Sequence, residues 1–294
     1  MILKYMVGNN VDGQRLDDAI AGGFDALSKS EARRIIDRGG CAVNGSMVRV
    51  ASRKMKSGDM IEIGVMEPGR FQELELCPQA LIYEDGDMIA VNKPAGVNTQ
   101  RTPYQLRGTL EYWVSEYFRR QAIHEPARVI HRLDRGTSGL MLFPKNKGAA
   151  AWLSSLFHDG KVQKRYLALC NGVTDKREWL EDGAIGKVGT ARYGIVAGGR
   201  SALTRFRVLE MKDRYALIEA YPKTGRTHQI RVHLAASLLP IVGDATYGGE
   251  KSERMLLHCE CLVLPGRDQK EICLHAPLDD LYQGWIDRCF SLLP

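Results

Sequence analysis

The sequence contains no apolar run near the roughly 20 residues with which a helix crosses a bilayer. Its first residues, MILKYMVGNN, lack the basic start and apolar core of a secretory signal peptide. The chain has seven cysteines in 294 residues, an odd number that does not indicate a disulfide framework in a chain without such a signal. We therefore expect a cytoplasmic protein, not bound to a membrane, with reduced thiols.

Two common cofactor motifs are also missing. No G-x-x-x-x-G-K-[ST] phosphate loop occurs, and no G-x-G-x-x-G follows a strand and opens a helix. The glycine-rich segment GAIGKVG at 183–189 has a different spacing and is better interpreted as a loop. We therefore expect neither a nucleoside triphosphate nor a dinucleotide cofactor.

The spacing of the histidines and cysteines gives little indication of a metal site. His228 and His233 are five residues apart, whereas ligands on one helical face are three or four apart. His258, Cys259 and Cys261 lie in an apolar stretch whose side chains would alternate between the two faces of a strand. We expect these residues to pack in the interior and predict no metal site.

The residues that are present describe an ordinary globular protein, with 44% hydrophobic and 26% charged residues and a length that suits one large and one small domain. The formal net charge of +6 favours a polyanionic partner over the alternative of solvated lysine faces.

Residues 11–66 are predicted to form the small domain. LDDAIAGG has helical apolar spacing and ends at paired glycines, and the next helix begins with Ser28 and Glu31 in a capping-box arrangement and ends near Gly39. Asn44-Gly45 predicts a hairpin. The second helix has an apolar face and a cationic face, the latter with Arg33, Arg34 and Arg38.

An arginine face beside a hairpin suits RNA phosphates, although a solvated charged face is the alternative. The module resembles the RNA-binding domain of ribosomal protein S-four, through R-L-D, S-x-x-E-A-R-R-x-I, V-N-G and G-D-x-I. Residues 67–79 are interpreted as a linker. Residues 80–294 mix helical stretches with many short strands and lack regular alternation, which predicts a mostly antiparallel α+β domain.

Three stretches of this larger domain carry candidate chemistry. VIHRLDRGTSGLMLF (129–143) sets Asp134 between two arginines in a turn-forming segment, so Asp134 is a turn residue or a catalyst. In QKRYLALCNG, Tyr166 heads a predicted strand, where it is either a functional tyrosine or an ordinary core tyrosine. In KTGRTHQIRVHLAASLLP (223–240), Thr227 is expected to cap a helix that runs to Pro240 and places Arg231 in its first turns.

HRLDRGTSG, KRYLAL and GRTHQIRVHLA, in this order, resemble the motifs of the RluA-type family of RNA pseudouridine synthases. GRSALTRFRVLE, VGDATYGG and LHAPL extend the resemblance to near the end of the chain. It implies a catalytic domain of pseudouridine synthase type that breaks the bond from ribose to uracil, turns the base and rejoins it through carbon, without cofactor, metal or energy source. With an S-four-like domain in front, the arrangement resembles bacterial enzymes that modify large-subunit ribosomal RNA.

The resemblance assigns roles to individual residues. Asp134 is implied to act on the flipped-out nucleoside, as a nucleophile at the sugar or as a base, with Arg231 paired to it and favouring its ionised form. Tyr166 is implied to stack on the target base.

Further residues are expected to contact the RNA. Arg132 is implied to enter the RNA stack when the uridine leaves it. Leu133 and Ile230 are expected to form apolar walls of the pocket, and Lys93, at the end of a predicted strand, is expected to contact RNA.

Rival hypotheses remain open from the sequence. Transfer RNA is an alternative substrate, and an inactive RNA-binding or ribosome-assembly protein of the same fold is an alternative function. A glycoside hydrolase shares cleavage at an anomeric carbon, but such enzymes usually use two carboxylates. We expect a monomer and have no functional interpretation of Cys259 and Cys261.

Overall fold

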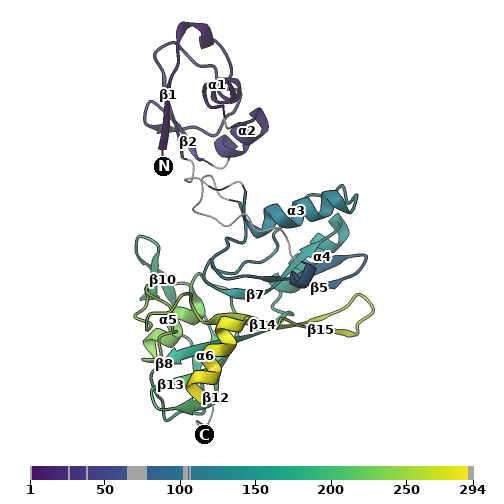
Figure 1. Cartoon of the computed structure of the whole chain (residues 1–294), viewed down its shortest axis with the longest axis vertical. Coiled ribbons are helices and arrows are strands. Elements are labelled where there is room, and N and C mark those ends of the chain that lie inside the picture. The colour runs from purple at the N-terminus through teal and green to yellow at the C-terminus, as the bar shows by residue number, and fades with distance from the viewer. Residues whose placement is uncertain are drawn as a thin grey trace. The chain divides into compact units, whose positions relative to one another are not determined.

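The computed structural model describes residues 2–25, 27–37, 39–64, 78–101, 105 and 107–290 (Figure 1). Contacts within the chain divide it into two compact units, one of residues 1–75 and 100–116, and one of residues 76–99 and 117–294. Within the described residues, no helix is both long enough and apolar enough to cross a membrane.

The first unit contains a four-stranded antiparallel sheet in the order β1-β4-β2-β3, two complete helices, and the first part of a third helix, α3 (Leu110–Arg120). Its elements are β1 (Ile2–Met6), α1 (Leu16–Gly23), α2 (Lys29–Asp37), β2 (Cys41–Val43), β3 (Ser46–Met47) and β4 (Met60–Gly64). The predicted capping box is confirmed, because the Glu31 carboxylate accepts from the Ser28 backbone nitrogen at 3.0 Å and the Glu31 nitrogen donates to the Ser28 hydroxyl at 3.3 Å. Asn44 and Gly45 both have positive φ, as their two-residue hairpin requires.

The predicted start of this module at residue 11 leaves out β1. That strand pairs along its whole length with β4, from Ile2 opposite Gly64 to Met6 opposite Met60. Strand pairing of this kind joins segments that are far apart in the chain, so ILKYM carries no local signal of its partner.

The second unit is built on a nine-stranded sheet in the order β5-β6-β7-β14-β8-β13-β12-β9, with β15 paired to β14. Among the described strands, only β7 and β14 pair in parallel. The predicted mostly antiparallel α+β fold is therefore confirmed. The strands are β5 (Leu81–Glu84), β6 (Met88–Lys93), β7 (Ser138–Pro144), β8 (Gln163–Asn171), β9 (Glu178–Glu181), β12 (Thr204–Lys212), β13 (Tyr215–Pro222), β14 (Leu257–Pro265) and β15 (Glu271–His275), and a separate hairpin pairs β10 (Ile185–Gly189) with β11 (Arg192–Ile195).

Helices cover the two faces of the centre of this sheet. The remaining helices are α3 (Leu110–Arg120), α4 (Lys147–His158), α5 (Gln229–Ala236) and α6 (Asp280–Phe290), and short 3-10 turns occur at Asn9–Val11 and Pro78–Ala80. Ile230 and Leu234 of α5 pack with Ala168 of β8, whereas Tyr282 of α6 packs with the next strand residue, Leu169. Because successive strand residues point to opposite faces, α5 and α6 lie on opposite sides of β8.

The predicted helix at 227–240 is shorter than expected. It begins at Gln229, after His228 in the left-handed conformation, and Thr227 does not cap it. The Gln229 side chain instead organises the preceding loop, where it accepts hydrogen bonds from the Arg226 nitrogen at 2.9 Å and the Thr224 hydroxyl at 2.6 Å. The helix ends at Ala236, and Leu238, which follows Ile230 and Leu234 at four-residue spacing, is 82% exposed.

Candidate active site

The three stretches singled out in the sequence converge on one pocket of the second unit. Asp134, Tyr166 and Arg231 all line a cavity of about 460 Å³. Its walls come from the turn before β7, from β8 and the end of α4, and from the loop that leads into α5. A cavity of this size is typical of a small-ligand site.

Asp134 lies in a turn that a second segment holds in place. The Thr137 nitrogen donates to the Asp134 carbonyl at 3.1 Å, which closes the turn. The Thr99 hydroxyl donates to the Leu133 carbonyl at 2.8 Å and accepts from the Leu133 nitrogen at 3.2 Å. The backbone around Asp134 is thus fixed on both sides, while its side chain remains 20% exposed at the pocket.

Arg231 connects two carboxylates. Its Nη1 donates to Asp134 Oδ2 at 3.2 Å, and its Nε and Nη2 donate to the two oxygens of Asp244 at 2.7 and 2.8 Å. Burial opposes the positive charge, but the hydrogen bonds and charges of both acids raise the pKa of Arg231 above its ordinary value. The aromatic ring of Tyr247 lies 5.0 Å from the guanidinium carbon. Arg231 is therefore a fixed, permanently charged partner of Asp134.

His228 adds a second nitrogen near Asp134. Its Nε2 lies 3.8 Å from Asp134 Oδ2, and its Nδ1 is 2.9 Å from the Tyr247 hydroxyl. Burial lowers the pKa of His228, and the nearby charge of Arg231 lowers it further, while the charge of Asp134 opposes them. A neutral imidazole thus lies beside the carboxylate at neutral pH.

Tyr166 lies on β8 opposite Cys259 of β14 and borders the same pocket. Burial, together with the neighbouring Cys259 thiol and the charge of Asp134, raises the pKa of Tyr166 well above its ordinary value. Burial also raises the pKa of the Cys259 thiol to about 12. Both side chains are therefore neutral, so the phenol is a proton donor and an aromatic surface.

Residues 87–236, which include Asp134, Tyr166 and Arg231, match the family described as RNA pseudouridylate synthase. The chain is 34% identical over 276 residues to an uncharacterized RNA pseudouridine synthase of Aquifex aeolicus, with 90% of this chain and 86% of that protein covered. It is 33% identical over 268 residues to ribosomal large subunit pseudouridine synthase D of Pasteurella multocida, with 90% and 82% covered. The solved structure of human RNA pseudouridylate synthase domain containing 1 has 30% identity and a TM-score of 0.58, covering 72% of this chain and 86% of that one.

This chain belongs to the RNA pseudouridine synthase family. The resemblance inferred from the three motifs is confirmed, and so is the expected class of enzyme, an isomerase that modifies RNA.

Three further residues predicted for this synthase line the pocket. Arg132 is exposed at its rim, while Leu133 and Ile230 are only 4% and 7% exposed and form apolar parts of its wall. Their positions agree with the sequence expectation, and their roles toward RNA remain predictions.

Lys93 lies elsewhere than expected, and the prediction that it contacts RNA is corrected. Its side chain is completely buried, and its Nζ donates to the carbonyls of Pro94, Val97 and Arg135 at 3.0, 2.8 and 3.3 Å. Burial lowers the pKa of Lys93 to about 7, although the charge of Asp134 opposes this effect. Lys93 connects the end of β6 to the turn that carries Asp134, because its Nζ donates to the Arg135 carbonyl.

In the first unit, Arg33 and Arg34 are exposed on α2, as predicted. The Arg33 Nε donates to the buried Asp17 carboxylate at 2.6 Å, which fixes part of its side chain. Arg38 lies outside the residues that the structure describes.

Asp244 and Tyr247 were missed as site residues. Both belong to VGDATYGG, a segment noted only for its resemblance to the family. A buried acid needs a partner, but the sequence does not show that the partner is Arg231, 13 residues earlier.

Proposed function

We propose that this synthase isomerises uridine in structured RNA with Asp134 as its catalytic carboxylate and without a cofactor. The observation that carries the proposal is the charge of the pocket: among the described residues that line it, Asp134 is the only carboxylate. The cationic side chains of its lining are Arg132, Lys164, Lys223, Arg226 and Arg231. One acid among cations suits a phosphate-bearing substrate, and it does not suit the two-carboxylate mechanism of most glycoside hydrolases.

The reaction breaks the carbon–nitrogen bond between ribose and uracil and forms a carbon–carbon bond at carbon 5 of the base, whose hydrogen is released. Asp134 acts on the ribose, as a nucleophile or as a base that removes a ribose proton. Both routes require the ionised carboxylate in a fixed orientation. Arg231 supplies that orientation, since its other nitrogens are held by Asp244.

The substrate base has to leave the RNA stack to reach Asp134. Base flipping costs a few kcal/mol, and side chains that replace the lost stacking reduce that cost. We assign Arg132, exposed at the rim, to the vacated position in the RNA, and the ring of Tyr166 to the flipped uracil. Leu133 and Ile230 form the apolar wall beside the base.

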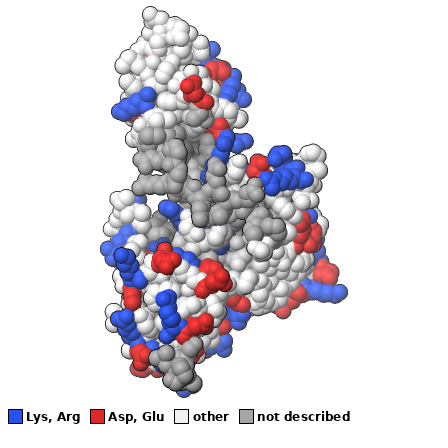
Figure 2. Space-filling model, in the orientation of Figure 1, with Lys and Arg blue, Asp and Glu red and all other residues white. Residues whose placement is uncertain are grey.

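For the substrate, we propose large-subunit ribosomal RNA, with transfer RNA as the alternative. The name of the Pasteurella relative, a ribosomal large subunit pseudouridine synthase that matches 90% of this chain, supports the former. We further propose that the first unit binds RNA through Arg33 and Arg34, as its likeness to the S-four module implies. On the face shown in Figure 2, Lys and Arg side chains are interspersed with Asp and Glu. Phosphates would therefore be contacted by local groups of arginines and not by one continuous basic surface. A monomeric, cytoplasmic enzyme remains our expectation.

The deciding experiment measures tritium release from RNA labelled at carbon 5 of uridine. Ribosomal RNA and bulk transfer RNA are each offered to the wild type, to Asp134→Asn and to Asp268→Asn, the same change at an exposed acid in the β14–β15 turn. We expect release with the wild type and Asp268→Asn and none with Asp134→Asn, which should still bind RNA. Release by Asp134→Asn at the wild-type rate would overturn the proposed catalytic residue, and release from transfer RNA alone would overturn the proposed substrate.

A further inference from the structure

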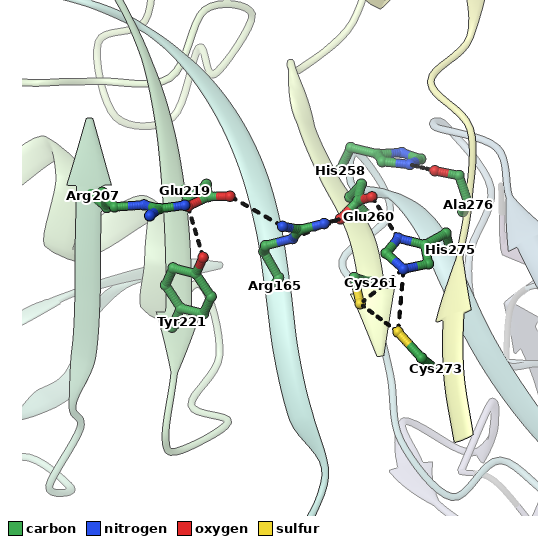
Figure 3. Close-up of polar contacts among 10 residues, drawn as sticks. All are labelled: Arg165, Arg207, Glu219, Tyr221, His258, Glu260, Cys261, Cys273, His275 and Ala276. Atoms are coloured by element: carbon green, nitrogen blue, oxygen red, sulfur yellow. Dashed lines mark hydrogen bonds and ion pairs between the residues drawn. The ribbon is translucent and has the colours of Figure 1, made fainter. Parts of the chain in front are cut away.

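The β14–β15 hairpin carries a cluster of sulfur and nitrogen atoms that does not line the active-site pocket. Cys261, Cys273 and His275 each direct one donor atom into a region where all three atoms lie within 4.8 Å of one another. The two Sγ atoms are 3.9 Å apart, and His275 Nε2 lies 3.9 Å from Cys261 Sγ and 3.2 Å from Cys273 Sγ (Figure 3).

The strand register explains why these three residues meet. Cys261 of β14 lies directly opposite His275 of β15, and Cys273 is two residues before His275, so all three side chains project from one face of the hairpin. His258 and Cys259, which were weighed with Cys261 from the sequence, are not part of the cluster. His258 Nδ1 is 2.8 Å from the Ser138 hydroxyl, and its Nε2 is 3.1 Å from the Ala276 carbonyl.

The distances fit a tetrahedral metal ion. With Zn–S near 2.3 Å and Zn–N near 2.05 Å, tetrahedral angles place two sulfurs about 3.8 Å apart and a sulfur and a nitrogen about 3.6 Å apart. The observed separation of the sulfurs is 3.9 Å, and the two sulfur–nitrogen separations, 3.2 and 3.9 Å, lie on either side of the ideal. Thiolate and imidazole are ligands that Zn²⁺ prefers.

The histidine is oriented as metal-bound histidines are. His275 Nδ1 is 2.8 Å from Glu260 Oε1, so a proton on Nδ1 is donated to the carboxylate and the Nε2 lone pair faces the sulfurs. Glu260 is itself held by Arg165, whose Nε and Nη2 lie 2.8 and 2.6 Å from Glu260 Oε2. Figure 3 shows this series of contacts continuing from Arg165 to Glu219 and Arg207.

A β-bulge places Glu260 beside the cluster. The register between β14 and β8 shifts between Cys259 and Cys261, so that Glu260 is the extra residue of the bulged strand. Without the bulge, the side chains of Glu260 and Cys261 would point to opposite faces. The irregularity brings a carboxylate to the face that carries both cysteines and the histidine.

We propose that Cys261, Cys273 and His275 bind a zinc ion that ties β15 to β14, with Glu260 as the residue that positions His275. Three protein ligands leave a fourth position for water. Cys261 is buried while Cys273 and His275 are exposed, so an ion reaches the site from solvent without unfolding of the hairpin.

The test is a titration of the reduced full-length chain with Co²⁺, whose thiolate complexes absorb in the near ultraviolet, followed by displacement with Zn²⁺. We expect one equivalent of Co²⁺ with a thiolate band, and loss of that band in Cys273→Ser, which changes an exposed residue, and in Cys261→Ser. Cys289→Ser, on α6, is the control for the cysteines and should leave the band unchanged.

Two histidine variants give a matched pair. His275→Gln should lose the band, whereas His158→Gln should keep it, because His158 is also exposed and also lies near a carboxylate through Nδ1, at 3.1 Å from Asp159. Glu260→Gln should retain the stoichiometry and weaken Co²⁺ binding by roughly tenfold, as loss of such supporting contacts does elsewhere.

The proposal is overturned if reduced wild-type protein shows no thiolate band, or if Cys273→Ser binds Co²⁺ as the wild type does. A Cys261–Cys273 disulfide in a protein that binds no ion when reduced also overturns it. None of these measurements depends on synthase activity.

Discussion

Arg231 is bound to Asp244 through two of its nitrogens, Nε at 2.7 Å and Nη2 at 2.8 Å, and this leaves Nη1 to contact Asp134 at 3.2 Å. A guanidinium is planar and rigid, so two bonds to one carboxylate fix the direction of the third contact. Asp244 is only 2% exposed and does not line the pocket, and its contact with Asp134 runs through Arg231.

We predict that Asp244→Asn lowers kcat about 10- to 100-fold and changes the KM for RNA little. The amide still accepts one hydrogen bond but does not hold the guanidinium by two charged oxygens, and misplacement of a reacting group by about 1 Å costs on the order of 100-fold in rate. Steady-state kinetics with Asp268→Asn as the control measure this. Wild-type kcat in Asp244→Asn would show that Asp134 alone positions Arg231.

A second prediction separates the ring of Tyr166 from its hydroxyl. Tyr166→Phe retains the aromatic surface and should bind RNA normally. Its kcat should fall about 100- to 10,000-fold, because a hydroxyl that transfers a proton contributes that much to the rate. Tyr166→Ala should also weaken RNA binding, because base stacking is lost. Tyr221→Phe, whose hydroxyl donates to Glu219 at 2.7 Å outside the pocket, is the control. Equal turnover by Tyr166→Phe and the wild type would limit Tyr166 to stacking.

Gly139 allows β7 and β14 to approach each other closely. Its φ is +113°, and a Cβ added there would lie 2.5 Å from the Cys259 backbone nitrogen and closer still to its carbonyl oxygen. We predict that Gly139→Ala destabilises the folded protein by about 3 kcal/mol or more, from backbone strain and overpacking together.

The matched control lies in the same motif. At Gly136, an added Cβ would meet the flexible end of Met255 at 3.3 Å, so Gly136→Ala should be far milder. Urea unfolding of both variants measures the difference, and equal free energies of unfolding would contradict the close-approach explanation.

His131 makes stability depend on pH. Its Nε2 accepts a hydrogen bond from the Leu142 nitrogen at 2.9 Å, and its ring stacks on Phe157 with centroids 4.3 Å apart. Burial, with a smaller contribution from Lys164, lowers the pKa of His131 to about 3, from an ordinary value of 6.5. Below about pH 6.5 the unfolded chain binds a proton that the folded chain does not, so this histidine reduces stability as pH falls toward 3.

The expected slope is at most about 1.4 kcal/mol per pH unit. His131→Gln retains an acceptor but does not titrate, so its stability should fall less steeply than that of the wild type between roughly pH 6.5 and pH 5. Urea unfolding at several pH values tests this, with the exposed His158→Gln as the control. Parallel curves for His131→Gln and the wild type would show that His131 titrates normally when folded.

Sequence signals were reliable for structures formed by residues that are close together in the chain. The capping box of Ser28 and Glu31 and the hairpin at Asn44-Gly45 involve residues within three positions of each other, and both formed as predicted. The end of α5 was misjudged because Leu238 continues the four-residue spacing of Ile230 and Leu234, while the helix ends at Ala236. Strand β1 was missed because its partner β4 is more than 50 residues away.

By itself, the sequence determined the fold class, the enzyme family and the three stretches that meet at the pocket, because turn chemistry, strand composition and motif order are properties of short segments. Only the tertiary structure decided which side chains of those stretches contact one another. Arg231 lies 97 residues from Asp134, and Cys261 and His275 face each other only through the register of one hairpin. The tertiary structure also decided that Lys93 is buried and does not face RNA. A lysine at a strand end is exposed or enclosed according to the segments that pack over it. These outcomes depend on strand pairing and packing between distant segments, which local sequence patterns do not encode.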